Sequence, residues 1–253
     1  MTPAAAPHFF KPIRIAAVGD GWLAVEKPAG VSVHNDPGGD LRWRLAAQVA
    51  ADTGLRRRID FDPGYGFHAV GRLDKAADGV VLCAWRPKVF AALSAQYAAR
   101  QTAKTYLVLL YGRLAGDEAP RTGIEWTWPL SPGAGGRRHP AGRPPRVDCR
   151  TDVTNLEQGR CFTLIECRPH TGRKHQIRRH AALAGHPVAG DRRYGPPEAA
   201  DRLVRRCGFD RIGLHARALR FTPPGADRAV TVKSGGVPAS FAALLKAGQT
   251  ERR

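Results

Sequence analysis

"HAVGRLDKAADGVVLCA", residues 68–84, places one aspartate, Asp74, between an arginine and an apolar run that begins at Gly79. The run from Gly79 to Trp85 is continuous and of strand length, which predicts a buried strand. A loop in front of such a strand can present a side chain while the sheet holds its backbone still. Asp74 is therefore a candidate functional carboxylate. The alternatives are a turn aspartate or a surface ion pair with Lys75.

Apolar spacing and turn residues outside this stretch predict a mixture of strands and helices. We expect strands over 13–18, 22–28, 79–85, 104–112, 146–153, 161–169, 214–221 and 229–233, and helices over 41–51, 86–101, 172–185 and 239–248. Residues 131–145 are too rich in glycine and proline for regular structure and predict a surface loop. Because strands and helices do not alternate strictly, the expected class is α+β.

The charge of the chain is strongly positive, with 40 Lys and Arg against 22 Asp and Glu, or +18 at pH 7. A GC-rich genome would inflate arginine in this way, but the charge is also concentrated. Between Arg137 and Arg193 there are thirteen basic and five acidic residues. Such a field attracts polyanions, so a nucleic acid is the expected partner.

Five cysteines, an odd number with no C-x-x-C pair, do not suggest a disulfide framework or a zinc ribbon. The start of the chain lacks a signal peptide core, and no run approaches the length of a membrane span. We therefore expect a cytoplasmic protein that does not associate with a membrane.

A second segment of interest, residues 168–195, is dense in arginine and histidine. Thr171 suits an N-cap, so a helix opening at Gly172 and Arg173 would offer free N–H groups to a phosphate. A metal site from His175 and His180 is not favoured, because five helical residues turn the second ring about 140° from the first. The alternative to a binding site is a solvated basic face.

The ordered set of motifs resembles the RluA-type RNA pseudouridine synthase family, which acts on large-subunit rRNA and on tRNA. The resemblance rests on Gly-Arg-Leu-Asp at 71–74, Lys-Thr-Tyr at 104–106, Thr-Gly-Arg-Lys-His-Gln-Ile-Arg-Arg-His at 171–180, Gly-His-Pro at 185–187, Gly-Asp at 190–191 and Leu-His-Ala at 214–216. Residues 24–34 also resemble that family's opening strand and Lys-Pro-x-Gly turn. The resemblance spans roughly residues 13–222.

The resemblance implies a role for each matching residue. Asp74 would be the catalytic aspartate, Tyr106 the tyrosine that stacks on the target base, and Arg178 the basic partner of the aspartate. Arg72 matches the arginine that fills the gap left by the flipped nucleotide. Further RNA-binding residues would be Arg173, Lys174, His175 and Arg179. No cofactor and no metal are implied.

The family also implies the organisation of the chain. We expect the pseudouridine synthase fold, a mixed but mainly antiparallel central sheet flanked by helices. A flexible arm would occupy residues 1–12 and the catalytic domain residues 13–253, without an S4 domain. The partner would be rRNA or tRNA, with no obligate protein partner and a monomeric state.

Two other functions fit parts of the sequence. One is an RNA-binding protein or RNA chaperone on the same fold without turnover, which would not need Asp74, Tyr106 and Arg178 together. The other is a nuclease with His175 and His215 as acid and base, which gives no reason for the Lys-Thr-Tyr motif.

The sequence departs from the family pattern at Gly71, where histidine is usual, and at Ala77-Asp78, where Thr-Ser is usual. We expect Asp78→Ser to leave pseudouridine formation within about tenfold of wild type, since removing one nearby charge changes the activation free energy by no more than about 1.36 kcal/mol. Initial rates on a uridine-containing RNA would measure this. A collapse of the rate would assign Asp78 a direct role.

Overall fold

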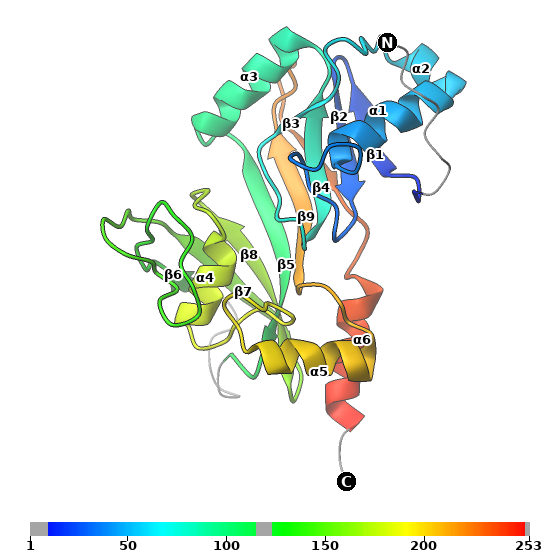
Figure 1. Cartoon of the computed structure of the whole chain (residues 1–253). Coiled ribbons are helices and arrows are strands. Elements are labelled where there is room, and N and C mark those ends of the chain that lie inside the picture. The colour runs from blue at the N-terminus through cyan, green and yellow to red at the C-terminus, as the bar shows by residue number, and fades with distance from the viewer. Residues whose placement is uncertain (1–9, 115–122, 251–253) are drawn as a thin grey trace. The chain divides into compact units, whose positions relative to one another are not determined.

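The apolar run after Asp74 forms β4 (Asp78–Ala84), and its residues from Gly79 on are buried, as predicted. β4 pairs antiparallel with β2 (Trp22–Lys27), with Lys27 opposite Gly79, and with the short β3 (His68–Val70). β1 (Arg14–Gly19) pairs antiparallel with β2, and both strands match the sequence predictions. In the computed structural model, which describes residues 10–114 and 123–250, these strands form the core of the first of two units (Figure 1).

Alternate residues of β2 and β4 face two different helices in this first unit. Leu23 and Val81 pack in one apolar cluster with residues of α1 (Leu41–Ala51), whereas Ala24 and Leu82 pack in another with Leu93 of α3 (Pro87–Ala98). Because side chains alternate across a strand, α1 and α3 cover opposite faces of the sheet. Both helices match the sequence predictions.

A short helix that was not predicted, α2 (Thr53–Arg58), follows α1. The Asp52 side chain caps it by accepting a hydrogen bond from the Leu55 N–H at 2.9 Å. The three arginines at 56–58 form its last turn and are exposed, so their charges lie near the negative end of the helix dipole.

The second unit is built on an antiparallel sheet with strand order β5-β8-β7-β6. These strands are β5 (Ala103–Tyr111), β6 (Ile124–Trp126), β7 (Thr151–Gln158) and β8 (Phe162–Pro169). Leu107 of β5 and Leu164 of β8 pack in one cluster with Leu203 of α5 (Pro197–Cys207) and Phe241 of α6 (Ala239–Thr250). The antiparallel pairing and the packed helices confirm the α+β class.

The chain passes between the two units more than once. The first unit contains residues 1–103 and 218–234, and the second contains 104–217 and 235–253. β9 (Leu214–Phe221) therefore begins in the second unit and ends in the first, where Ala218–Phe221 pair with β10 (Val230–Lys233).

Several boundaries differ from the predictions. The strand expected at 146–153 begins only at Thr151 and continues to Gln158. The helix expected at 172–185 is α4 (Gln176–Leu183). Neither β6 nor α5 was predicted; α5 begins directly after Pro196, and its Pro197 occupies the first turn, where a missing N–H carries no penalty.

Three further predictions concern the cysteines, membrane-spanning helices and the N-terminal arm. All five cysteines are free thiols. None of the described helices combines the length and apolar character needed to cross a membrane. Most of the arm expected at residues 1–12 lies outside the described residues, which begin at Phe10.

Candidate active site

Asp74 lies in the loop between β3 and β4, and its side chain is half-buried. The loop turns tightly there, with the Ala77 N–H donating to the Asp74 carbonyl oxygen at 3.1 Å. Lys75 points elsewhere and pairs with Asp36, Nζ to Oδ2 at 3.5 Å. The alternative of a surface ion pair between Asp74 and Lys75 is therefore not what the structure shows.

The buried side chain of Lys27 fixes the backbone of this loop. This side chain is only 1% exposed, and its Nζ donates to the carbonyl oxygens of Ala77 (2.5 Å), Lys75 (3.2 Å), Pro28 (2.8 Å) and Val31 (2.8 Å). The pairing of Lys27 with Gly79 places the ammonium beside the loop. A buried cation needs such acceptors, because an ammonium without them would be strongly destabilised. Lys27 thus ties the turn after β2 to the loop of Asp74.

Gly71, which departs from the family pattern, sits where a side chain would not fit. Its φ is +87°, and a Cβ on it would lie 2.8 Å from Cε2 of Tyr97. The histidine that is usual at this position would need both a left-handed backbone and a displaced Tyr97. Arg72, the next residue, is exposed and forms no ion pair or hydrogen bond with any described residue.

Tyr106 and Arg178 belong to the second unit, whereas Asp74 belongs to the first. Tyr106 lies on β5, opposite Cys167 of β8, and is 9% exposed. Arg178 lies on α4 and forms a buried, two-pronged pair with Asp191: Nε to Oδ2 at 2.6 Å and Nη2 to Oδ1 at 2.9 Å. This fork geometry fixes the plane of the guanidinium.

Asp191 also organises the backbone that follows it. Its Oδ1 accepts hydrogen bonds from the N–H groups of Arg193 (2.9 Å) and Tyr194 (3.1 Å). The Tyr194 ring lies 5.2 Å from the Arg178 guanidinium, and its hydroxyl lies 3.0 Å from Nδ1 of His175. Burial raises the pKa of Tyr194, which keeps the phenol neutral. The structure therefore brings His175 and Arg178 together around Tyr194.

The expected helix start at Thr171 is wrong. Thr171 Oγ1 donates to Oε1 of Gln176 at 2.7 Å instead of capping a helix, and the Arg173 N–H donates to the same oxygen at 3.1 Å. His175 is the residue before α4 and has a left-handed backbone, φ 55°. The predicted phosphate site needed the N–H groups of Gly172 and Arg173 to lie in the first turn of a helix. Both residues precede α4, so this part of the prediction is wrong.

The remaining predicted RNA-binding residues differ in exposure. Lys174 is exposed, and Arg173 is half-buried with an Nε that is shielded from solvent and has no hydrogen-bond partner. Arg179 is fully buried, so the expectation that it contacts RNA directly does not fit its position. Its guanidinium instead donates to groups of the protein: the carbonyl oxygens of Pro140, Ser131, Gly133, Lys174 and Ala141, and Oγ of Ser131.

His180 is also internal. Its Nε2 donates to the Trp128 carbonyl oxygen at 3.0 Å, and its Nδ1 accepts from Oγ1 of Thr151 at 3.0 Å. Burial lowers the pKa of His180, which favours the neutral ring. Among the residues that the structure describes, no group of three or more His, Cys, Asp or Glu side chains is arranged to hold a metal ion.

Two residues were assigned no role from the sequence, although both lie in quoted motifs. Lys27 belongs to the Lys-Pro-x-Gly turn, and Asp191 ends the Gly-Asp pair at 190–191. A lysine as the last residue of an apolar strand is a weak signal of burial. An aspartate thirteen residues beyond an arginine carries no signal, since their contact depends on the path of the chain between them.

Comparison with known proteins gives one consistent family. A family model described as RNA pseudouridylate synthase matches residues 21–183. The chain is 33% identical to ribosomal large subunit pseudouridine synthase D of Xanthomonas campestris, over 93% of this chain and 69% of that one. It is 30% identical to tRNA pseudouridine synthase C of Pasteurella multocida, over 84% and 87%.

The fold is likewise similar to solved structures. Human RNA pseudouridylate synthase domain containing 1 superposes with a TM-score of 0.69 at 22% identity, covering 94% of this chain and 95% of that one. The corresponding human domain containing 4 protein gives 0.68 at 19% identity, covering 92% of each chain. The expected fold is confirmed.

Replacing Lys27 should affect both stability and turnover. We expect Lys27→Met to lower the free energy of unfolding by about 3 kcal/mol, because buried carbonyls lose a charged donor. Turnover should fall more than RNA affinity, since the loop of Asp74 loses its support. Urea unfolding and single-turnover rates would measure the two effects. Lys75→Met is the matched control, and equal effects of the two substitutions would contradict this role of Lys27.

Replacing Asp191 tests the buried pair. Asp191→Asn removes the carboxylate that forms two charge-assisted hydrogen bonds with the buried Arg178 guanidinium, which should lower the free energy of unfolding by about 3 to 5 kcal/mol. Asp201→Asn removes a carboxylate from an exposed pair with Arg192 (2.5 Å) and should cost less than about 1 kcal/mol. Chemical denaturation of both variants would compare them; similar losses would argue against a special role for the buried pair.

Proposed function

Since the chain belongs to the RNA pseudouridylate synthase family, we propose that it isomerises uridine to pseudouridine in structured rRNA or tRNA, with Asp74 as the catalytic carboxylate. The observation that carries the assignment of Asp74 is its loop: a half-buried carboxylate on a backbone that the buried Lys27 holds through the carbonyl oxygens of Lys75 and Ala77. Such support keeps a reacting group within the narrow range of positions that catalysis requires.

The proposed reaction needs little from the protein besides this carboxylate. The N1–C1′ bond of the uridine breaks, the ring turns and a C5–C1′ bond forms. The C5 proton leaves to solvent and N1 takes up a proton, so the product is an isomer and there is no net oxidation or reduction. Asp74 can attack C1′ as a nucleophile or take a proton from C2′ as a base, and both routes require the ionised form. No cofactor, metal or second protein takes part in this scheme.

The other predicted site residues enter the proposal through their match to the family motifs. Tyr106 would stack on the target base and Arg178 would act as the basic residue of the active site, with its guanidinium held in one plane by Asp191. Arg72 would enter the RNA where the flipped nucleotide leaves it, and its exposed guanidinium, which has no described partner, is available for that role. Arg173, Lys174 and His175 would bind the RNA backbone.

We further propose that residues 13–253 act as one catalytic domain in the cytoplasm, as a monomer. The family match at 21–183 supports the single domain, because it includes residues of both units. Five free cysteines are consistent with a reducing compartment. Relatives are named for ribosomal RNA and for tRNA, so both RNA classes are tested as substrates.

Asp74→Asn separates an enzyme from an RNA-binding protein without turnover. The amide keeps the volume but can act neither as nucleophile nor as base, so tritium release from RNA labelled at C5 of uridine should become undetectable. RNA binding by filter retention should persist, because affinity comes mainly from the arginines.

The control for this substitution is Asp36→Asn, which also removes a carboxylate from the first unit and should retain near wild-type turnover. The substrates are unmodified large-subunit rRNA and unmodified tRNA. Tritium release by Asp74→Asn above a few per cent of the wild-type rate would overturn the role of Asp74. Absence of release by the wild-type protein on both RNAs would favour the RNA-binding alternative.

A further inference from the structure

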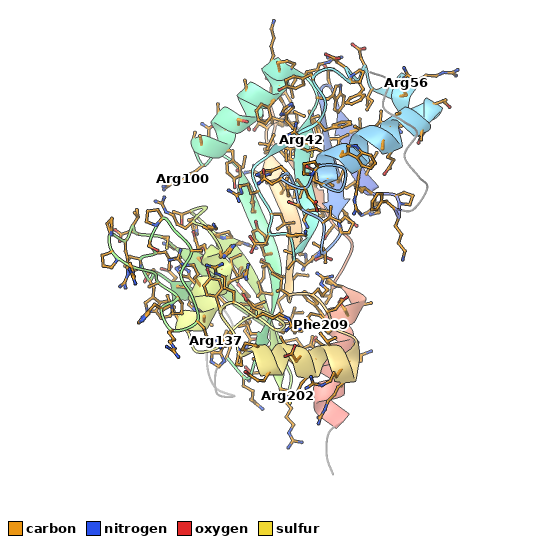
Figure 2. The ribbon with its side chains drawn as sticks, in the orientation of Figure 1. Arg42, Arg56, Arg100, Arg137, Arg202 and Phe209 are labelled. Carbon is orange, nitrogen blue, oxygen red and sulfur yellow. The ribbon has the colours of Figure 1, made fainter. Side chains whose placement is uncertain are left out.

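The segment Ser131–Val147, here called the basic loop, carries positive charge and no acid. Its residues include Arg137, Arg138, Arg143 and Arg146 but no Asp or Glu. All four arginines are exposed. Figure 2 labels Arg137 on this loop of the second unit. These arginines could be a solvated part of the surface, or they could be held in place to bind a ligand.

The buried Arg179 gives the loop a fixed conformation. Its Nη1 donates to the carbonyl oxygens of Ser131 (3.0 Å) and Gly133 (3.1 Å), its Nη2 to that of Ala141 (2.6 Å), and its Nε to that of Pro140 (2.6 Å). One rigid guanidinium therefore holds the start of the loop to its middle. Gly142 has φ +75°, and a Cβ there would meet Ser131 and the Arg179 guanidinium, so the loop closes tightly over this group.

A second set of contacts links the basic loop to the turn after Asp191. Arg137 Nε donates to the Gly195 carbonyl oxygen at 2.8 Å, and Arg193 Nη2 donates to the Gly135 carbonyl oxygen at 3.0 Å. Each guanidinium uses only part of its donors in these contacts, and each stays exposed. Arg193 therefore extends the positive surface of the basic loop.

The charges of this surface are not neutralised within the protein. Nearby arginines pair with acids: Arg150, just before β7, with Glu125 at 2.7 Å, and Arg168 of β8 with Glu166 at 2.7 Å. Among the residues that the structure describes, the four arginines of the basic loop and Arg193 form no ion pair. An ordered surface with unpaired guanidinium groups is what a polyanion requires.

An aromatic side chain precedes this surface. Trp128 is 40% exposed, while its carbonyl oxygen accepts hydrogen bonds from the buried His180 and from Cys149 Sγ (3.2 Å). Its backbone is thus held from inside, and the indole is partly exposed while it contacts the His180 ring at a centroid distance of 6.1 Å. A partly exposed ring in the segment that leads into a loop of unpaired cations suits unpaired nucleotides, whose bases stack while the phosphates meet the charges.

We propose that the basic loop, Arg193 and Trp128 form a preorganised docking surface for an unpaired RNA strand outside the target uridine. The proposal rests on the function proposed above and adds a class of RNA structure: a loop or bulge with at least one unstacked base. Arg179 is a positioning residue of this surface and does not touch the RNA. Because its contacts fix the loop before binding, little ordering entropy is lost when RNA docks.

The first experiment removes charge without removing the contacts that hold the loop. Arg138→Gln with Arg143→Gln should weaken binding of an unmodified hairpin RNA about tenfold at low salt. It should also lower the slope of log Kd against log salt by about 1.4, or about 0.7 for each lost phosphate contact with a single strand.

The control is Arg202→Gln with Arg205→Gln on α5, which removes the same charge from the same unit at exposed positions without ion pairs among the described residues. Figure 2 labels Arg202 on that helix. Equal losses of affinity in the two double variants would mean that only net charge matters, and would overturn the proposal.

A second experiment tests the stacking platform. Trp128→Ala should weaken binding to the hairpin by at least about fivefold, as loss of one stacked base predicts, and should leave binding to a fully paired duplex of the same length unchanged. Phe10→Ala removes another exposed aromatic ring, which is 43% exposed and belongs to the first unit, and should have no effect. Equal losses on hairpin and duplex would contradict stacking.

The two proposals fail in different ways. If the wild-type protein binds the hairpin through the basic loop but releases no tritium, the docking surface stands and the proposed function fails. If the wild-type protein forms pseudouridine while the loop and Trp128 variants bind normally, the function stands and the docking surface is wrong. Preferential binding of an acidic peptide over the hairpin at the basic loop would also overturn it.

Discussion

A buried ammonium group fixes the conformation of two turns in the first unit. Lys27 ends an otherwise apolar strand, and the charge it carries into the interior must be surrounded by oxygen atoms. Those oxygens come from two separate turns, at Pro28 and Val31 on one side and at Lys75 and Ala77 on the other. Each turn is thereby held in the conformation that presents its carbonyls inward, and the Asp74 side chain is positioned as a result.

The second unit uses the same physical solution with a different cation. Arg179 is surrounded by carbonyl oxygens of the basic loop, as Lys27 is by those of the Asp74 loop. The planar guanidinium spreads its donors more widely than an ammonium does, and so it can hold a long segment without regular secondary structure. In both units, carbonyl oxygens of segments outside the sheets and helices accept their hydrogen bonds from a buried, positively charged side chain.

The strands and helices could be predicted largely because their signals are local. The run from Gly79 to Trp85 and the helix from Leu41 to Ala51 carry their hydrophobic pattern within a few residues. The start of α4 was misplaced because Thr171 is as good a cap as any, and only the fold shows that its hydroxyl bonds Gln176. Asp74 could be selected because the family motif includes it.

The roles of Arg178 and Arg179 show where sequence reasoning stops. Adjacent arginines on one helix look equivalent in a sequence, yet one is locked to Asp191 and the other is enclosed by a loop some forty residues earlier. The difference depends on the 100° turn between neighbouring helical positions combined with partners that are distant in the chain. Asp191 and Lys27 were passed over for the same reason: each acquires its role only through contacts that the fold creates.

The route of the chain also has a consequence for how the protein is made. Because the first unit is completed by residues 218–234, it lacks β10 and the end of β9 until those residues have been synthesised. The second unit needs α6, which follows the last residues of the first unit in the chain. Neither unit is a continuous piece of polypeptide, so no single cut in the chain releases either one whole. The order of translation thus completes the first unit only shortly before the second, although most of the first unit is synthesised first.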